Sequence, residues 1–249
     1  MSERPALHTL IYGDSGAGKS TGAATWPKPM LVFMFDPHGK ETPYLKRGAV
    51  KASMAEDGTP IHEVFSERTG DLLVRIEHYI DTDPLKPGAY ARFLQRLARS
   101  GEFPDWKSLV VDSVTFMELM ARKYAQYHLM PNTKEPRQWY AISTETLEEV
   151  LLVRFGSLPQ NVVVLAHVDE DRDESSGVFV RNPMFPGRLR KRSPAGYSEV
   201  YRAYVLRQPQ GGREYLWQTR SDLQYNATTQ IEATDPCPQG YANLWVGEP

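Results

Sequence analysis

Residues 13–20 have the types and the spacing that phosphate binding requires. They read GDSGAGKS and match G-x-x-x-x-G-K-[ST] at every fixed position. An apolar run, Leu7–Tyr12, precedes this motif, and a predicted helix from about Gly18 to Ala24 follows it. Glycines let the backbone form a nest of N–H groups around a phosphate, and a helix N-terminus adds partial positive charge. An ordinary glycine turn would need neither flanking element, so the context favours a nucleotide-binding P-loop.

Each position of the P-loop has an expected role. We expect the Lys19 ammonium to reach the β- and γ-phosphates, the Ser20 hydroxyl to bind Mg²⁺ and Thr21 to contact the α-phosphate. The predicted nucleotide-binding residues are Gly13, Asp14, Ser15, Gly16, Ala17, Gly18, Lys19, Ser20 and Thr21. The sequence lacks the guanine-reading pattern Asn-Lys-x-Asp, which favours ATP over GTP. The expected ligands are therefore ATP and Mg²⁺.

A second apolar run, Ser108–Asp112, ends in an acidic residue and has the form of a Walker B strand. We expect Asp112 to hold Mg²⁺ together with Ser20. The alternative is that Asp112 or Ser113 only caps the helix that follows. No acidic residue comes directly after Asp112, so a water-activating carboxylate is expected after the earlier strand, Met30–Phe35.

Asp36 and Glu41 are the carboxylates available after that earlier strand. Asp36 has an alternative interpretation as a turn residue before Pro37. His167 ends a further predicted strand, and strand tips in open α/β sheets face the ligand. A neutral imidazole both donates and accepts hydrogen bonds, so we expect His167 to sense the γ-phosphate, although it could also merely cap the strand.

Arg220 ends the last predicted strand, Arg213–Arg220. It is a candidate arginine finger for the γ-phosphate of a neighbouring subunit. The alternative is a surface arginine paired with Asp222. The complete set of predicted catalytic residues is Lys19, Asp36, Glu41, Asp112, His167 and Arg220.

Residues 168–174 are acidic, and residues 187–192 are basic with four cations. One interpretation is a solvated loop whose charges compensate one another. The other is a mobile DNA-binding loop, in which the cations contact phosphates and aromatic side chains stack on bases. The cations are Arg188, Arg190, Lys191 and Arg192, the aromatic residues are Phe179, Phe185 and Tyr197, and Arg137 is a weaker candidate. In this interpretation the acidic half repels DNA while the loop is disordered, which allows a nucleotide-gated switch.

The elements that must position these residues alternate between apolar strands and helices. Such alternation predicts an α/β fold with a mostly parallel central sheet flanked by helices. A hairpin is indicated around Asp57-Gly58 and a half-exposed strand at 72–80, and the predicted helices cover 89–99, 114–127 and 144–155, the last entered through Ser143 or Thr144. Glu199–Arg207 and Arg213–Arg220 predict a C-terminal antiparallel hairpin that extends the sheet. Without a visible linker, residues 1–249 form one domain, with a core at about 5–222 and an extension, 223–249, that carries no recognisable chemistry.

The composition excludes several classes of protein. The chain has 249 residues, 41% hydrophobic and 24% charged, which excludes a disordered tail or a fibre. A net charge of −2 excludes a generally basic nucleic-acid coat, and a single cysteine, Cys237, excludes an internal disulfide and a cysteine-based zinc cluster. The apolar runs are too short to span a bilayer and the N-terminus has no apolar signal core, so we expect a soluble protein of the cytoplasm.

Taken together, the motifs resemble phage-encoded AAA/RecA-like P-loop ATPases, including the minimal RecA-core ATPases that act as single-strand annealing recombinases. The resemblance covers about residues 5–222 and is carried by residues 13–20, 35–37 with Gly39, 109–113, and 162–167 followed by 186–187. It implies a RecA-type core, Mg-ATP hydrolysis, binding and annealing of single-stranded DNA in recombination, and action beside a single-strand-binding protein in an infected or host bacterial cell. It also implies rings or filaments with ATP sites between subunits. His38 stands where the RecA-type pattern has a glutamate, so slow, DNA-stimulated turnover is expected.

Two other functions remain open at this point. One is a slow nucleotide-switched assembly or regulatory protein that acts on a protein partner instead of DNA. The other is a small-molecule kinase, although the sequence offers no arginine-rich lid apart from residues 188–192. Salt dependence separates the first two functions, because phosphate contacts make affinity fall steeply with salt.

Overall fold

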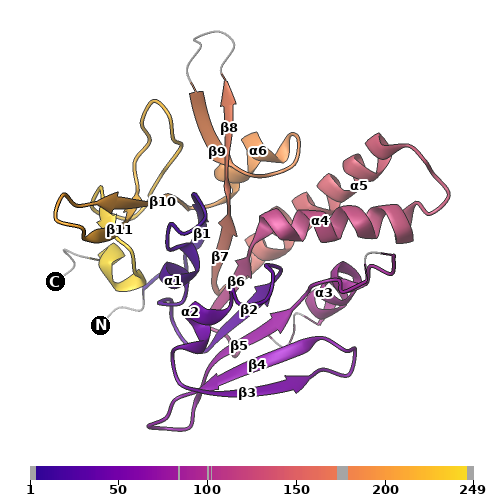
Figure 1. Ribbon diagram of the computed structural model, residues 1–249, viewed down its shortest axis with the longest axis horizontal. Coiled ribbons are helices and arrows are strands. Elements are labelled where there is room, and N and C mark those ends of the chain that lie inside the picture. The colour runs from indigo at the N-terminus through magenta and orange to yellow at the C-terminus, as the bar shows by residue number, and fades with distance from the viewer. Residues whose placement is uncertain (1–3, 84, 100, 102, 173–178, 246–249) are drawn as a thin grey trace.

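A ten-stranded sheet forms the centre of the computed structural model (Figure 1), counted over the part of the chain that the structure describes. This part comprises residues 4–83, 85–99, 101, 103–172 and 179–245. The strand order is β12-β11-β10-β1-β7-β6-β2-β5-β4-β3. A separate two-stranded sheet, β8-β9, projects from this body (Figure 1).

Four buried strands make up the middle of the sheet: β1 (His8–Tyr12), β7 (Asn161–Ala166), β6 (Ser108–Asp112) and β2 (Met30–Met34). Every neighbouring pair among them is parallel. Strand β7 therefore lies between the P-loop strand β1 and the acidic strand β6. This arrangement confirms the expected mostly parallel central sheet. The strands appear as unbroken apolar runs in the sequence because both faces are covered.

Helices cover both faces of the sheet. Helices α3 (Ala89–Ala98), α4 (Val114–Tyr124) and α5 (Pro136–Glu148) pack on one face, and α1 (Lys19–Ala23) and α2 (Thr42–Leu45) pack on the other. Side chains alternate between the two apolar cores along each strand, as the pleat requires. On β1, Leu10 and Tyr12 enter the first core, and Ile11 enters the second. Among the described residues, no helix has the length and apolar character needed to cross a bilayer.

Antiparallel strands extend the sheet at both edges. At one edge, β3 (Ala49–Met54) and β4 (Pro60–Phe65) form a hairpin, and β4 pairs with β5 (Leu72–His78). At the other edge, β10 (Glu199–Arg207) and β11 (Arg213–Gln218) form a second hairpin, followed by β12 (Cys237–Pro238). Both hairpins agree with the turn signals in the sequence, and the second confirms the predicted C-terminal extension of the sheet.

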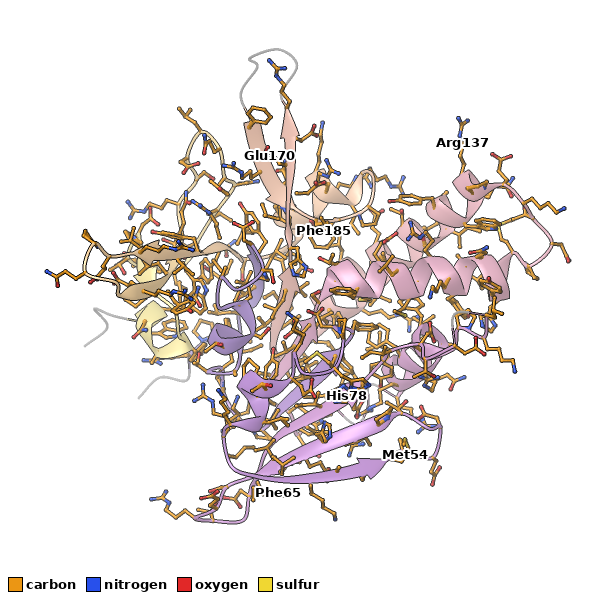
Figure 2. The ribbon with its side chains drawn as sticks, in the orientation of Figure 1. Met54, Phe65, His78, Arg137, Glu170 and Phe185 are labelled. Atoms are coloured by element: carbon orange, nitrogen blue, oxygen red, sulfur yellow. The ribbon has the colours of Figure 1, made fainter. Side chains whose placement is uncertain are left out.

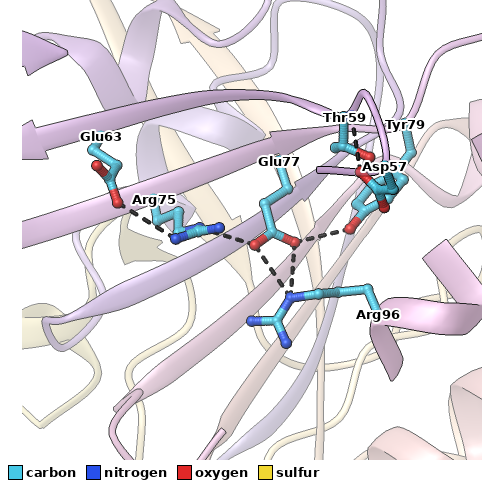
Figure 3. A network of polar contacts seen from close by, with 7 residues as sticks. All are labelled: Asp57, Thr59, Glu63, Arg75, Glu77, Tyr79 and Arg96. Atoms are coloured by element: carbon cyan, nitrogen blue, oxygen red, sulfur yellow. Dashed lines mark hydrogen bonds and ion pairs between the residues drawn. The ribbon is translucent and has the colours of Figure 1, made fainter. Parts of the chain in front are cut away.

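A buried carboxylate, Glu77, links the edge of the sheet formed by β3, β4 and β5 to helix α3 (Figure 3). Glu77 on β5 accepts hydrogen bonds from Arg75 Nε at 2.9 Å, from Arg96 Nε of α3 at 3.2 Å and from the Tyr79 hydroxyl at 2.8 Å. Arg75 also pairs with Glu63 on β4 at 3.5 Å. A buried charge with this many partners is compensated. We therefore assign the network a structural role.

Two segments differ from the sequence-based expectation. The charged segment that was expected to be a loop contains β8 (Val168–Arg172), β9 (Phe179–Pro183) and the short helix α6 (Leu189–Arg192). The acidic residues Asp173 and Glu174 lie outside the described residues. The predicted boundary at Ser143 or Thr144 is wrong, because α5 begins at Pro136 and both hydroxyls bind the Tyr140 carbonyl within the helix. Proline at a first helical position favours this earlier start.

Candidate nucleotide-binding site

A cavity of about 660 Å³ lies at the carboxyl ends of the central strands. It combines residues of the P-loop, of the segment after β2, of the ends of β6 and β7, and of the C-terminal part of the chain. The predicted site residues that line it are Ser15, Gly16, Gly18, Lys19, Ser20, Thr21, Asp36, Asp112 and His167. The other predicted P-loop residues, Gly13, Asp14 and Ala17, shape the backbone next to it.

Glycine is required at two P-loop positions for different reasons. A Cβ at Gly13 would lie 2.2 Å from the carbonyl oxygen of Ala203 on β10, so no side chain fits between these strands. Gly18 has φ +84°, in the left-handed region that side chains disfavour. The turn is closed by the Ala17 N–H, which donates to the Asp14 carbonyl at 3.2 Å.

Lys19 is held by the backbone of its own loop. Its Nζ donates to the carbonyl oxygens of Gly13 at 2.8 Å and Asp14 at 2.9 Å, and only 8% of the residue is exposed. Burial lowers the pKa of Lys19, and the nearby Asp112 and Asp36 carboxylates oppose this shift. Among the residues that the structure describes, the ammonium has no direct carboxylate partner, so an anionic ligand can approach it at the cavity.

Asp112 lies at the end of β6 and is 2% exposed. Its Oδ2 accepts a hydrogen bond from the hydroxyl of Tyr44 on α2 at 2.8 Å. Burial, followed by the negative charge of Asp36, raises the pKa of Asp112, and hydrogen bonding from Ser20 and Tyr44 opposes the increase. A divalent cation would favour the charged carboxylate. The Asp112 carboxylate and the Ser20 hydroxyl are hard oxygen donors of the kind that Mg²⁺ takes alongside substrate phosphates, so the residues present fit Mg-ATP.

Asp36 joins the ends of β2 and β6. Its Oδ1 accepts hydrogen bonds from the Ser113 backbone N–H at 3.0 Å and from the Ser113 hydroxyl at 2.5 Å. The N–H groups of Phe35 and Asp36 in turn donate to the Asp112 carbonyl. The alternative that Asp112 or Ser113 side chains cap α4 is not observed, since Tyr44 and Asp36 are their partners. Asp36 therefore lines the cavity and also holds the ends of β2 and β6 together through its hydrogen bonds with Ser113.

The family comparison agrees with this geometry. A family described as AAA domain matches residues 6–195. The chain belongs to the AAA domain family. Its P-loop, Lys19 and Asp112 are assembled around one cavity, which is the arrangement of a P-loop nucleotide-binding site.

Two solved structures are similar to this AAA domain at low sequence identity. One is described as a prototypical ATPase from the type III secretion system of pathogenic bacteria, with a TM-score of 0.47 and 13% identity over 80% of this chain. The chain spans about half, 52%, of that ATPase. The other is the flagellar accessory protein FlaH from Methanocaldococcus jannaschii, with a TM-score of 0.42 and 10% identity, covering 93% of this chain and 88% of FlaH. No curated protein sequence matches the chain.

His167 lies beside the P-loop cavity, and its role as a γ-phosphate sensor stays a prediction. It directly follows β7, lines the cavity, and its backbone N–H donates to the Thr115 hydroxyl at 3.0 Å. Burial, followed by the charge of Lys19, lowers the pKa of His167. The neutral ring that results can donate one hydrogen bond and accept another.

Two other predicted catalytic side chains lie away from the cavity lining. Glu41 is buried beside α2, and its Oε2 accepts a hydrogen bond from the Gly39 N–H at 2.7 Å. Arg220 is exposed and lines a separate cavity of about 640 Å³. The expected partner of Arg220, Asp222, instead accepts hydrogen bonds from Gln218 Nε2 and the N–H groups of residues 224 and 225. Roles for Glu41 in water activation and for Arg220 toward a neighbouring subunit stay predictions.

The four predicted DNA-binding cations gather on and beside α6 in the AAA domain. Arg190 pairs with Asp169 at 2.6 Å and with Asp171 at 3.2 Å. Arg188 and Arg192 both pair with the carboxylate of Glu148 on α5, at 3.2 and 2.8 Å. Lys191 is exposed. The structure therefore shows much of the self-compensation that one interpretation of this segment expected.

The aromatic residues of this segment divide into two groups. Phe185 and Tyr197 are buried in the core, so the expectation that they stack on bases is wrong. Phe179, on β9, is 50% exposed and remains available. Figure 2 shows Glu170 on the projecting hairpin, Phe185 at its base and Arg137 extending away from α5.

Several side chains of the site were not foreseen from the sequence, and three of them matter most for its geometry. Tyr44 holds Asp112, and Tyr215 and Gln239 line the cavity from the C-terminal part of the chain. Gln239 lies in the extension to which the sequence assigned no chemistry. None of these residues belongs to a local pattern around the P-loop, since they reach it through the tertiary fold.

Proposed function

We propose that this AAA domain binds and hydrolyses Mg-ATP and uses the reaction to control its binding to single-stranded DNA during annealing or homologous recombination. The observation that carries the proposal is the convergence of Lys19, Ser20, Asp112 and His167 on one cavity. The resemblance to phage-encoded annealing recombinases supports DNA as the partner. On this proposal the protein forms rings or filaments beside a single-strand-binding protein, with the exposed Arg220 acting on a neighbouring subunit.

The residues of the cavity have distinct tasks in this proposal. The P-loop N–H groups and Lys19 bind the phosphates, and Ser20 and Asp112 hold Mg²⁺, which neutralises charge on the phosphate oxygens. Asp36 is the carboxylate after β2 that lines the cavity, so it orients the attacking water through the oxygen that Ser113 does not engage. Positioning without a fully available base is consistent with slow turnover.

A covalent connection links the cavity to the proposed DNA contact. His167 lines the cavity, and β8 begins at the next residue, Val168. The hairpin β8-β9 then leads to α6, which carries Arg190, Lys191 and Arg192. A change at His167 on nucleotide binding can therefore be transmitted to α6 through β8, whose Asp169 and Asp171 pair with Arg190.

The second candidate function is a nucleotide-switched regulator that acts on a protein partner. It is favoured by the ion pairs that neutralise Arg188, Arg190 and Arg192 in this conformation. An α6 that kept these pairs permanently would offer little positive charge to DNA.

Steady-state ATP hydrolysis with and without single-stranded DNA tests the proposal. The Lys19→Ala variant is the blank, and the same oligonucleotide as a duplex is the control for strand type. Stimulation of the wild type by single strands would support the recombination ATPase. Hydrolysis that ignores DNA, together with no DNA binding at low salt, would contradict the proposal and favour the regulator.

A further inference from the structure

The cavity extends to both sides of the P-loop strand. Asp36, Asp112 and His167 line it from the side of β2, β6 and β7. Tyr215 and Gln239 line it from the side of β11 and β12. Because β1 lies between these two groups of strands, the cavity has a charged half and an opposite half built by the C-terminal part of the chain.

Gln239 is locked onto the P-loop backbone. Its Nε2 donates to the carbonyl of Ala17 at 2.8 Å and to the carbonyl of Leu216 at 3.1 Å. Its own N–H donates to the Tyr215 carbonyl at 3.0 Å. Both protons of the amide group are committed in this way, so Oε1 is the polar atom that Gln239 can offer to a ligand.

The C-terminal segment also contacts the residues that follow α1. The Tyr241 N–H donates to Thr25 Oγ1 at 2.8 Å, and the ring of Tyr241 lies 4.9 Å from the ring of Trp26. A Cβ at Gly18 would lie 2.5 Å from Gln239 Oε1 and 2.8 Å from Tyr215 Cδ1. Gly18 therefore leaves room for these two side chains, and it also allows the left-handed turn of the P-loop.

Tyr215 is exposed, although the two residues that follow it are buried. Its residue is 40% exposed, whereas Leu216 and Trp217 are in the interior. An aromatic ring on the open wall of a polar cavity presents a face on which a planar base can stack. The charged half of the cavity suits phosphates and Mg²⁺, so the half with Tyr215 suits the uncharged part of the same ligand.

We propose that Tyr215 and Gln239 form the nucleoside subsite of this cavity. The Tyr215 ring stacks on the base of the bound nucleoside triphosphate, and Gln239 holds that ring beside the P-loop and faces the nucleoside with Oε1. The inference rests on the proposed function, since it assigns the second half of the same nucleotide site. It gives the C-terminal extension a binding role.

Binding of two ligands that share their phosphates tests the subsite. Mg-ATP and Mg-tripolyphosphate are titrated by calorimetry into the wild type, Tyr215→Ala and Tyr215→Phe. We expect Tyr215→Ala to weaken ATP about tenfold, as loss of one base stack does, while tripolyphosphate binding stays unchanged. Tyr215→Phe keeps the ring and should bind ATP within about twofold of the wild type. Tyr127→Ala is the matched control, because Tyr127 is 39% exposed and lies outside the cavity lining.

Each other outcome overturns the inference in a recognisable way. Unchanged ATP affinity in Tyr215→Ala would remove the stacking role. Equal loss of ATP and tripolyphosphate would show damage to the P-loop instead of a base contact. If the wild type bound neither ligand, the proposed function would fail and the subsite with it. Gln239→Ala, measured in the same way, covers the case in which Tyr215→Ala does not fold, and unchanged ATP binding there would also contradict the subsite.

Discussion

Lys19 in the nucleotide cavity and the arginines around α6 are all held by oxygen atoms, but the oxygens differ in charge. Lys19 is bound by two neutral backbone carbonyls and is buried. Arg188, Arg190 and Arg192 are bound by carboxylates near the surface. Carbonyls leave the charge of the lysine available to a ligand, whereas carboxylates neutralise the arginines until they are displaced. The cavity is thus prepared for its anion, while α6 must exchange partners to bind one.

Exposure decides how costly that exchange is. The side chains of Arg188 and Arg192 are mostly exposed, and exposed ion pairs contribute at most about 1 kcal/mol each. A DNA phosphate can therefore compete with Glu148 for both arginines. Substitutions in the nucleotide cavity and substitutions around α6 should therefore change hydrolysis and DNA binding by different amounts and in different directions.

Asp112→Asn should have the largest effect of these substitutions. Asparagine can still accept the Tyr44 hydroxyl, but it removes the charge that holds Mg²⁺. We expect hydrolysis at saturating ATP and fixed Mg²⁺ to fall on the order of a hundredfold, and chelation of Mg²⁺ to abolish the wild-type rate. Thermal unfolding controls for folding. A variant with wild-type turnover would show that Asp112 is only structural.

Replacing the four cations on and beside α6 with alanine should weaken DNA binding substantially. The variant combines Arg188→Ala, Arg190→Ala, Lys191→Ala and Arg192→Ala. We expect affinity for an oligothymidylate to fall about tenfold, and the salt slope to flatten by about 0.7 for each DNA phosphate that the variant no longer binds. Fluorescence anisotropy over a salt series measures both quantities, with Lys51→Ala on the opposite edge strand as control. An unchanged slope would exclude α6 from the DNA site.

Tyr44→Phe tests how the cavity orients its carboxylate. The substitution deletes the hydroxyl that donates to Asp112 Oδ2 and keeps the buried ring. We expect hydrolysis to fall about tenfold and the Mg²⁺ requirement to increase, because a hydrogen bond to a charged carboxylate contributes about 1.5 kcal/mol or more. Rates over a Mg²⁺ titration are the measurement. Identical Mg²⁺ curves for the variant and the wild type would mean that Tyr44 does not position Asp112.

Glu148→Gln should have the smallest effect of these substitutions. It should strengthen DNA binding, whereas the other substitutions weaken binding or hydrolysis. Removing this carboxylate releases Arg188 and Arg192, so affinity for single-stranded DNA should increase about threefold. The matched control is Glu149→Gln, because Glu149 is adjacent and pairs with Arg154 at 2.9 Å. If Glu148→Gln bound DNA with weaker or unchanged affinity while Glu149→Gln also changed nothing, the proposed exchange of Glu148 for a DNA phosphate would be contradicted.

The same contrast explains what could be predicted from the sequence. The parallel strands were predictable because strands buried on both faces are apolar throughout, and the P-loop was predictable because its contacts are local. The hairpin β8-β9 was missed because Val168–Arg172 is mostly charged and has no apolar alternation. Tyr44 and Gln239 were missed because they reach their partners across 68 and 222 positions of sequence. Contacts over such separations leave no pattern that a single sequence can show.

We propose that this AAA domain hydrolyses ATP in the cavity around Lys19. Steady-state release of phosphate from Mg-ATP by the wild type and by Lys19→Ala, measured at equal concentration and with folding verified, tests it most directly. We predict measurable turnover by the wild type, a Lys19→Ala rate at the level of the protein-free blank, and weaker nucleotide binding by the variant. Turnover by Lys19→Ala equal to that of the wild type would contradict the claim.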